Sequence, residues 1–317
     1  MTTSPAGPVV DLVEVGPRDG LQNEARTLAI DTRIELIERL VAAGIRRLEA
    51  VSFVRADRVP QMAGAEEVLG GLSALDDVTL IGLVLNRRGA ERAALTRCQE
   101  LNMVVPVTDT FAVRNQGAPT AALLEQTAGV VDVAREAGRS VSVTLAVAFG
   151  CPFEGEVATA RVAEVVDRVL DLGIDELALA DTVGVGVPTQ VEAFGALLAG
   201  DERLRRLRFH FHNTRNTGYA NAYAATLVDL AGVGGRVSLD SSVGGFGGCP
   251  FAPAATGNIA TEDLLHLLRR TGAEVRDADA HDLTPLTDIA SWLSAELGSP
   301  VQALLGRAGD EIGRAHV

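Results

Sequence analysis

The sequence repeats one pattern eight times: a short apolar run, often β-branched, is followed by a longer segment with helical periodicity and a turn. Such runs are typical of strands and helices in alternation. Strands are expected at residues 9–15, 47–53, 78–85, 101–108, 140–149, 176–180, around 208–213 and 236–242. Helices are expected at 31–43, 65–72, from 89, 120–137, 157–172, from 189, 220–230 and from 261. Eight such units in about 260 residues predict an α/β fold, the (β/α)8 TIM barrel.

A doubly wound parallel sheet shows the same alternation and is the rival fold. That fold predicts an early Gly-x-Gly-x-x-Gly motif, which this sequence lacks. Helical segments after Thr284 fall outside the eight units. We therefore expect a barrel domain over residues 1–283 and a short helical C-terminal extension over 284–317 that packs on the barrel.

Charge and composition exclude several kinds of partner. The net charge is −14 and the pI about 4.8, which argues against nucleic acid and against an anionic membrane surface. All 28 basic residues are arginine, so no lysine-linked cofactor is expected. Three widely spaced cysteines, and no signal peptide or membrane-length apolar run, predict a reduced, cytoplasmic protein.

His210 and His212 alternate with Phe209 and Phe211 in the seventh expected strand. Residues two apart in a strand share a face, so both imidazoles should point into one space, roughly 7 Å apart along the strand. Two convergent imidazoles suit one metal ion. A strand whose histidines are only hydrogen-bonded is an equal alternative.

Polar residues follow the expected strand ends, and in a barrel these ends meet on one face. They are Arg18, Asp19, Glu49, Asp109, Cys151, Asp181, His210, His212 and Asn258. Asp19 and Asn258 lie in glycine-rich loops and are the expected carboxylate and amide ligands, although Asp19 alone also suits a turn. Two imidazoles with these oxygens favour Mg²⁺ or Mn²⁺ over Zn²⁺.

Arg18 and Cys249 add chemistry to this face. A fixed guanidinium at Arg18 can stabilise negative charge that develops on a carbonyl oxygen, whereas its alternative role is a surface ion pair. Cys249 lies in a glycine-rich segment that can act as a lid carrying a thiol, and a structural cysteine in a tight turn is an equal alternative.

Several motifs together resemble 3-hydroxy-3-methylglutaryl-CoA lyases. They occur in that family's order and cover nearly the whole expected barrel. They are Val15-Gly16-Pro17-Arg18-Asp19-Gly20-Leu21-Gln22-Asn23-Glu24, Val51-Ser52-Phe53-Val54, Val59-Pro60-Gln61-Met62, Phe149-Gly150-Cys151-Pro152-Phe153-Glu154-Gly155, Asp181-Thr182-Val183-Gly184-Val185-Gly186, and Gly247-Gly248-Cys249-Pro250-Phe251-Ala252-Pro253 through Gly257-Asn258.

The resemblance implies a divalent-metal-dependent lyase that cleaves a 3-hydroxyacyl-CoA to acetyl-CoA and a keto acid, as in leucine degradation, and that forms a homo-oligomer. By position, four residues correspond to the family's metal ligands: Asp19, His210, His212 and Asn258. Arg18 resembles the arginine beside the thioester carbonyl, Cys249 the loop cysteine, and Glu49 and Asp181 the supporting acids. His210 and Asp19 count among the catalytic residues as well.

Two segments depart from the family's pattern. After the second histidine the usual Asp-Thr-Tyr-Gly is replaced by Asn213-Thr214-Arg215-Asn216, which adds a cation and removes a carboxylate near the metal. On the fourth strand Ser-x-Ser-Glu is replaced by Pro106-Val107-Thr108-Asp109, although Asn115 keeps its place. The departures predict that the acyl pocket differs from that of the family and that the carboxylate end of the substrate is bound differently.

Two other functions fit the same barrel. A condensing enzyme of the isopropylmalate-synthase type shares the metal site but normally carries a long regulatory extension. A catalytically inactive barrel that binds acyl-CoA or a protein partner is the third alternative, and the joint retention of the metal-site residues, Arg18 and Cys249 argues against it.

Overall fold

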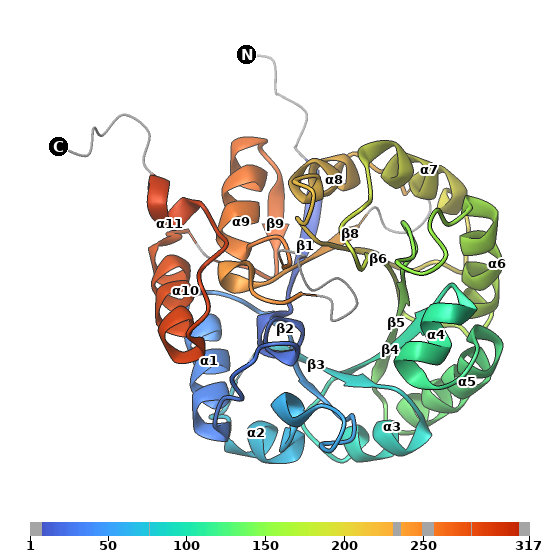
Figure 1. The fold of residues 1–317 in the computed structure, drawn as a ribbon, viewed down its shortest axis with the longest axis horizontal. Helices are drawn as coiled ribbons and strands as arrows, with labels where there is room; N and C mark the ends of the chain where they lie inside the picture. The colour runs from blue at the N-terminus through green and yellow to red at the C-terminus, as the bar shows by residue number, and fades with distance from the viewer. Residues whose placement is uncertain (1–7, 76, 231–235, 249–256, 280, 311–317) are drawn as a thin grey trace.

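A closed ring of eight parallel strands forms the centre of the molecule (Figure 1). The computed structural model describes residues 8–75, 77–230, 236–248, 257–279 and 281–310. The ring closes because β1 pairs with both β8 and β2, so the predicted TIM barrel is confirmed. Its strands are β1 (Val9–Glu14), β2 (Arg47–Ser52), β3 (Thr79–Val84), β4 (Glu100–Pro106), β5 (Ser140–Ala146), β6 (Glu176–Asp181), β7 (Leu207–Phe211) and β8 (Val237–Ser241).

Helices surround the ring on the outside (Figure 1). Most follow the predicted units, and α4, directly after β4, was not expected from the sequence. The helices of the eight units are α1 (Ile30–Ala42), α2 (Ala65–Gly71), α3 (Arg87–Ala94), α4 (Asp109–Gln116), α5 (Thr120–Glu136), α6 (Thr159–Leu170), α7 (Pro188–Leu198), α8 (Gly218–Thr226) and α9 (Thr261–Arg270), with short turns at η1 (Gly16–Gly20), η2 (Pro60–Met62) and η3 (Val243–Gly245). Among the described helices, none is long and apolar enough to cross a membrane.

A ninth strand, β9 (Glu274–Arg276), lies beside the start of β1 and was also missed. The register pairs β1 with β2 only at Glu14, so the two strands separate below that point and β9 pairs there with β1. An antiparallel bridge from Ala278 to Ile45 continues this contact toward β2. The segment therefore fills the gap between the first two strands of the ring.

The chain ends in α10 (Thr284–Leu297) and α11 (Leu305–Ala308). The helix α10 packs against α1, α9 and the turn η3, and it buries Leu286, Ile289 and Leu293. The division of the chain at residue 283 stays a prediction.

The side chains of β7 alternate between the outer face of the barrel and its interior. Phe209 and Phe211 point outward and their rings stack 5.6 Å apart, next to Phe149 from the loop after β5. Arg208 and His210 occupy the alternate positions and face the barrel interior. The predicted alternation of this strand is confirmed, because side chains two residues apart share one face.

The barrel interior is ionic where such barrels usually hold branched apolar side chains. Arg47 lies there, only 2% exposed, and donates to Glu100 at 2.7 Å and to Glu176 at 2.6 Å. Ser238 also donates to Glu176, at 2.7 Å. This guanidinium is the closest cation to both carboxylates, since Arg208 lies 3.5 Å from Glu176 and Arg206 lies 3.9 Å from each.

We expect Arg47→Met to lower the free energy of unfolding by about 3–5 kcal/mol, because it leaves two buried carboxylates without their closest cation. Urea denaturation followed by circular dichroism measures the loss. The matched control is Arg87→Met, which removes an exposed i,i+4 pair with Glu91 and should cost about 0.5 kcal/mol or less. Equal losses in the two variants would show that the interior pair contributes no more than a surface pair.

Candidate metal and active site

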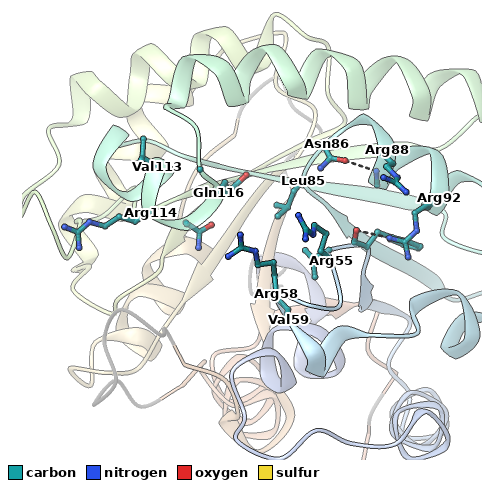
Figure 2. Close-up of a pocket in the computed structure, with 15 residues that line it drawn as sticks. Arg55, Arg58, Val59, Leu85, Asn86, Arg88, Arg92, Val113, Arg114 and Gln116 are labelled. Atoms are coloured by element: carbon teal, nitrogen blue, oxygen red, sulfur yellow. Dashed lines mark hydrogen bonds between the residues drawn. The ribbon is translucent and has the colours of Figure 1, made fainter.

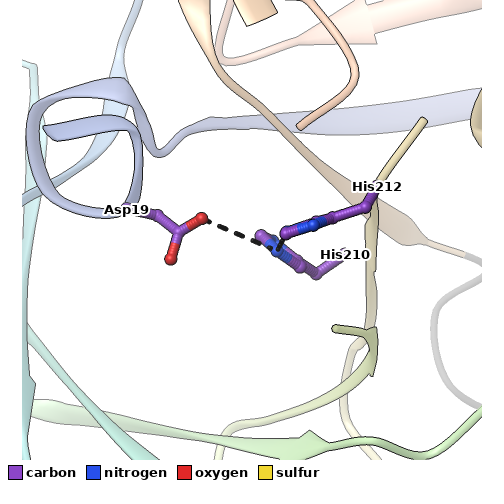
Figure 3. A group of neighbouring side chains, drawn as sticks. All are labelled: Asp19, His210 and His212. Atoms are coloured by element: carbon purple, nitrogen blue, oxygen red, sulfur yellow. Dashed lines mark hydrogen bonds and ion pairs between the residues drawn. The ribbon is translucent and has the colours of Figure 1, made fainter. Parts of the chain in front are cut away.

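Three side chains that can ligate a metal converge at the carboxyl ends of the strands (Figure 3). Asp19, His210 and His212 each offer one ligand atom, and these atoms all lie within 4.8 Å of one another. The Nε2 atoms of the two histidines are 3.1 Å apart, and His210 Nε2 lies 3.8 Å from Asp19 Oδ2. The rings thus converge more closely than the strand spacing of their backbones suggests.

A single π-helical turn after β1 holds Arg18 and Asp19 side by side. The carbonyl of Val15 accepts from the amides of Asp19 at 2.7 Å and Gly20 at 3.2 Å. A single π turn is a wide loop of backbone that often occurs at functional sites. A Cβ at Gly16 would lie 2.6 Å from Glu14 Oε1, the oxygen that accepts from the amides of Gly16 and Val243.

Asp240 on β8 sets the orientation of His210. Its Oδ2 lies 3.1 Å from Nδ1 of His210, and a proton on Nδ1 leaves the lone pair of Nε2 facing Asp19 and His212. Arg208 stands behind, with Nε 3.6 Å from Asp240 and 3.5 Å from Glu176. Asp240 and Arg208 were not among the predicted site residues, although each is a charged residue at an inward position of a buried strand.

The charges around the cluster hold Asp19 and His212 in the forms that bind a cation. Burial raises the pKa of Asp19, but Arg18 and the two imidazoles outweigh it and hold this pKa well below its usual range. Burial and the neighbouring His210 lower the pKa of His212 to about 3. Burial also lowers the pKa of His210, but Asp240 and Asp19 outweigh that effect and raise it. An ionised Asp19 and a neutral His212 are ready to bind a metal.

Glu49 on β2 holds Arg18 in place. Arg18 donates from Nε to Glu49 at 2.7 Å and from Nη1 to Asp19 at 2.7 Å. Asn102 on β4 donates to the other oxygen of Glu49 at 2.8 Å. The guanidinium therefore stands beside Asp19 with its plane set by a buried carboxylate, and the supporting role of Glu49 in catalysis stays a prediction.

Asn258 adjoins the cluster as well. Its Nδ2 donates to Asp19 at 2.9 Å and to the carbonyl of Phe246 at 3.0 Å. Its Oδ1 is buried and has no hydrogen-bond partner among the described residues. Gly247, at φ +103°, allows this approach, since a Cβ there would lie 2.6 Å from the Asn258 amide. A buried amide oxygen without a partner, beside a carboxylate and two imidazoles, fits a divalent cation with mixed oxygen and nitrogen ligands.

Other predicted residues lie differently. Asp181 does not line the pocket, because its oxygens accept from the amides of Val185 at 2.8 Å and Gly186 at 2.9 Å. Cys151 is buried, and its sulfur accepts from Thr108 at 3.2 Å, as a structural cysteine does. Cys249 falls outside the described residues, so its role as a lid thiol stays a prediction.

The two departures from the family's pattern are engaged in the scaffold. Arg215 donates to the carbonyls of Val183 and Gly184, both at 3.0 Å, and does not line the pocket. Asn213 accepts from the amide of Gly218 at the start of α8. Asp109 accepts from the amide of Thr120 and also lies outside the pocket lining. The added cation is therefore directed at backbone carbonyls and not at the metal ligands.

A pocket of about 200 Å³ opens over the cluster. Arg18, Asp19, His210 and His212 form one wall. Asp240 also lines the pocket, and the remaining lining is neutral polar or apolar, with Gln22, Asn23, Leu83, Asn102, Val104, Phe111, Asn115, Thr144 and Thr182 among its residues. Such a pocket can orient a small polar group over the metal ligands.

Comparisons with known proteins agree on one family. A family model described as HMGL-like matches residues 9–292. The chain is 42% identical to the (R)-citramalyl-CoA lyase of Chloroflexus aurantiacus, over 95% of both chains. It is 38% identical to the hydroxymethylglutaryl-CoA lyase of Pseudomonas mevalonii, over 94% of this chain and 96% of that one. A solved HMG-CoA lyase of Acinetobacter baumannii, in complex with coenzyme A and 3-methylmalate, superposes with a TM-score of 0.88 at 35% identity, covering all of both chains.

We expect Asp240→Asn to weaken Mn²⁺ binding about 10–100-fold, because a neutral amide holds and polarises His210 less well than a carboxylate. Isothermal titration calorimetry with Mn²⁺ measures the affinity. Asp201→Asn is the control, since it removes a surface carboxylate that pairs with Arg203 and should leave the affinity unchanged. Unaltered Mn²⁺ binding in a folded Asp240 variant would contradict the orienting role.

Proposed function

Because the chain belongs to the HMGL-like family of carbon–carbon lyases, we propose that it cleaves a 3-hydroxyacyl-CoA to acetyl-CoA and a keto acid with the help of a divalent cation. The observation that carries the proposal is the convergence of Asp19, His210 and His212 in one pocket beside the Arg18 guanidinium. A carbon–carbon cleavage needs a hydroxyl that loses its proton and a carbonyl oxygen that gains charge, and these groups supply both needs.

We assign the cation to Asp19, His210, His212 and the amide oxygen of Asn258, and we expect Mg²⁺ or Mn²⁺. When bound, such an ion supplies Lewis acidity that lowers the pKa of a coordinated hydroxyl. Asp240 keeps the proton of His210 on Nδ1, so that Nε2 faces the ligand side. This arrangement is the reason that we place the C3 hydroxyl of the substrate over the cluster.

Arg18 stabilises the charge that the cleavage creates. A general base takes the hydroxyl proton and later returns it to C2. As the base takes the proton, C3 becomes a ketone, the C2–C3 bond breaks, and its electron pair moves to the thioester carbonyl oxygen. A guanidinium held by Glu49 faces this oxygen and stabilises the enolate without having to reorient. Protonation of C2 then gives acetyl-CoA. We keep Cys249 as the proposed lid thiol and Asp181 as a residue that supports the loop through its backbone hydrogen bonds.

For the substrate we propose 3-hydroxy-3-methylglutaryl-CoA or a related branched 3-hydroxyacyl-CoA that carries a carboxylate. Citramalyl-CoA is a second candidate, favoured by the 42% identity to an (R)-citramalyl-CoA lyase. It is one methylene shorter, so its carboxylate lies on the same carbon as the hydroxyl. Arg18 is the one cationic side chain among the described residues that line the small pocket, so amides and hydroxyls must hold a more distant carboxylate.

A coupled assay for acetyl-CoA tests the proposal directly. The two candidate thioesters are incubated with the protein and either Mg²⁺ or Mn²⁺, with chelator-treated protein as the control. We expect metal-dependent acetyl-CoA release from at least one thioester, and the ranking of kcat/KM identifies the acyl group. Condensation of acetyl-CoA with a 2-oxo acid, without cleavage activity, would favour the isopropylmalate-synthase alternative instead. Activity that survives complete metal removal would contradict the role of the cation.

We expect Arg18→Gln to lower kcat about 10²–10³-fold, since it removes one preorganised donor for the developing oxyanion. Steady-state kinetics at saturating metal measure the loss. The variant also leaves Glu49 buried with Asn102 as its remaining side-chain partner, so some loss of stability is expected alongside.

The double variant Arg18→Gln with Glu49→Gln separates the two effects, because it removes the unpaired buried charge while leaving the oxyanion donor absent. We expect its thermal stability to recover toward that of the wild type and its kcat to stay low. Recovery of both stability and turnover would show that Arg18 acts only as a structural partner of Glu49.

A further inference from the structure

Two buried carboxylates take no part in the proposed chemistry. Glu14 on β1 and Glu262 on α9 are both 0% exposed. Unlike Glu49, Glu100 and Glu176, neither forms an ion pair with an arginine or a histidine among the residues that the structure describes. Burying a carboxylate without a cation is costly, and its hydrogen bonds must offset that cost.

Glu14 is the last residue of β1, and its carboxyl group bonds to three separate segments. Its Oε1 accepts from the amide of Gly16 at 2.7 Å and from the amide of Val243 at 3.0 Å. Its Oε2 accepts from the hydroxyl of Thr261 at 2.5 Å. These partners belong to the π-helical turn after β1, to the turn η3 after β8 and to the first turn of α9. One carboxyl group therefore joins segments that are far apart in the sequence.

Each of the three segments leads to a group of the proposed metal and oxyanion site. The π-helical turn carries Arg18 and Asp19. The helix α9 begins at Thr261, three residues after Asn258. The turn η3 leads to Phe246, whose carbonyl accepts from the Asn258 amide at 3.0 Å. Because Asn258 also donates to Asp19 at 2.9 Å, the relation between these two ligands depends on how the three segments are held together.

Backbone contacts bring the same three segments together around Ser242. Its amide donates to the carbonyl of Ile259 at 3.0 Å, and its carbonyl accepts from the amide of Thr261 at 3.2 Å. The π-helical turn lies against its side chain, since a Cβ at Gly20 would lie 2.8 Å from Ser242 Oγ. By contrast, Glu262 binds only the turn η3 in the described part of the chain, through the amide of Gly244 at 3.0 Å. Of the two carboxylates, Glu14 is therefore the one that reaches all three segments.

The neutral form of Glu14 can make the same hydrogen bonds as the ionised form. Burial raises the pKa of Glu14 to about 7, although the bonds from Thr261 and from the two amides lower it. With a proton on Oε2, this oxygen donates to the Thr261 hydroxyl, which can donate to Ser241 Oγ at 2.8 Å. Oε1 still accepts from both amides. Glutamine likewise has one carbonyl oxygen and one donor group, so it is the matched replacement at this position.

We propose that Glu14 is a positioning residue of the active site, whose hydrogen bonds fix where Arg18 and Asp19 lie relative to Asn258. The inference rests on the proposed function, since it names what holds that site together. Glu14 does not line the small pocket, so it acts through the backbone of the three segments. Loss of its hydrogen bonds should lower both the metal affinity and the turnover, because both depend on exact placement of these groups.

Mn²⁺ calorimetry on variants of the full-length protein tests this role without any lyase chemistry. Glu14→Leu keeps a side chain of similar size and removes all three hydrogen bonds, whereas Glu14→Gln keeps them. We expect Glu14→Leu to bind Mn²⁺ about 10–100-fold more weakly than wild type. We expect Glu14→Gln to bind it within about threefold of wild type.

Leu123→Ala is the control for lost stability alone. Leu123 is buried on α5 and lies outside the small pocket, so its truncation leaves a cavity far from the three segments. Thermal unfolding followed by circular dichroism should show a lower Tm for both Leu123→Ala and Glu14→Leu. We expect the Mn²⁺ affinity of Leu123→Ala to equal that of wild type.

Steady-state kinetics at saturating Mn²⁺ give a second measure. We expect kcat to fall about 10²-fold in Glu14→Leu, because small displacements of catalytic groups are costly, and to stay near the wild-type value in Glu14→Gln and Leu123→Ala. Wild-type Mn²⁺ affinity in a folded Glu14→Leu variant would overturn the proposal. An equal loss of affinity in Glu14→Gln would also overturn it, since the charge of Glu14 and not its hydrogen bonds would then matter. So would an equal loss in Leu123→Ala.

Thr261→Val is a smaller change, and it carries the test if Glu14→Leu does not fold. It removes the hydroxyl that Glu14 binds and leaves the two amide hydrogen bonds in place. We expect Mn²⁺ binding about threefold or more weaker than in wild type. Unchanged affinity in this variant would then overturn the proposal.

The positioning role and the proposed reaction can be told apart. Mn²⁺ affinity that falls in Glu14→Leu and is retained in Glu14→Gln, in a protein that cleaves no thioester, would support the positioning role and count against the lyase reaction. Metal-dependent cleavage at the same rate and with the same Mn²⁺ affinity in wild type and Glu14→Leu would keep the lyase reaction and overturn the positioning role.

Discussion

The hydrogen bond between His210 and Asp240 is the interaction on which the site depends. It fixes one ring nitrogen as a donor and leaves the other facing His212 and Asp19. Asp240 is itself held by a column of alternating charge that descends through Arg208 and Glu176 to Arg47. Opposite charges alternate along the barrel axis, so each of these buried charges has an oppositely charged neighbour. The held Asp240 carboxylate then fixes the orientation of the His210 imidazole.

Barrel closure supplies the second half of the site. The ring brings β1 next to β8, and so places the π-helical turn after β1 close to the histidines of β7. That turn carries Arg18 and Asp19 as consecutive residues, which an extended strand would point in opposite directions. Glu49 from β2 then holds the guanidinium. Arg18 and Asp19, from the start of the chain, therefore meet His210 and His212, from its last third.

Two pockets of different character share the lining residues Val54, Val59, Leu85 and Asn115. The small pocket holds the reactive groups among neutral amides and hydroxyls, where a developing charge is stabilised most strongly. The large one is an arginine pocket of about 1040 Å³, lined from loops and helices outside the ring by Arg55, Arg58, Arg88, Arg92 and Arg114 (Figure 2).

The sequence by itself determined the barrel and the identity of the cluster. Eight alternations of apolar runs and helical periods specify the repeat, and the spacing of His210 and His212 specifies a shared face, because both follow from local backbone geometry. It did not reveal β9, in which one half-buried valine lies between two exposed charged residues. Nor did it show that Arg215 would donate to the carbonyls of Val183 and Gly184. Residue types alone cannot tell which partner a long charged side chain will meet.

Only the tertiary structure decided the support of the site and the location of the arginine pocket. Asp240 meets His210 across neighbouring strands, and Arg58 and Arg88 share a pocket although they lie on different segments. These contacts depend on strand register and barrel closure, which join residues distant in the chain. Local sequence patterns do not specify such long-range contacts. They therefore predicted Asp19, His210 and His212 as candidate ligands but did not predict that Asp240 orients His210.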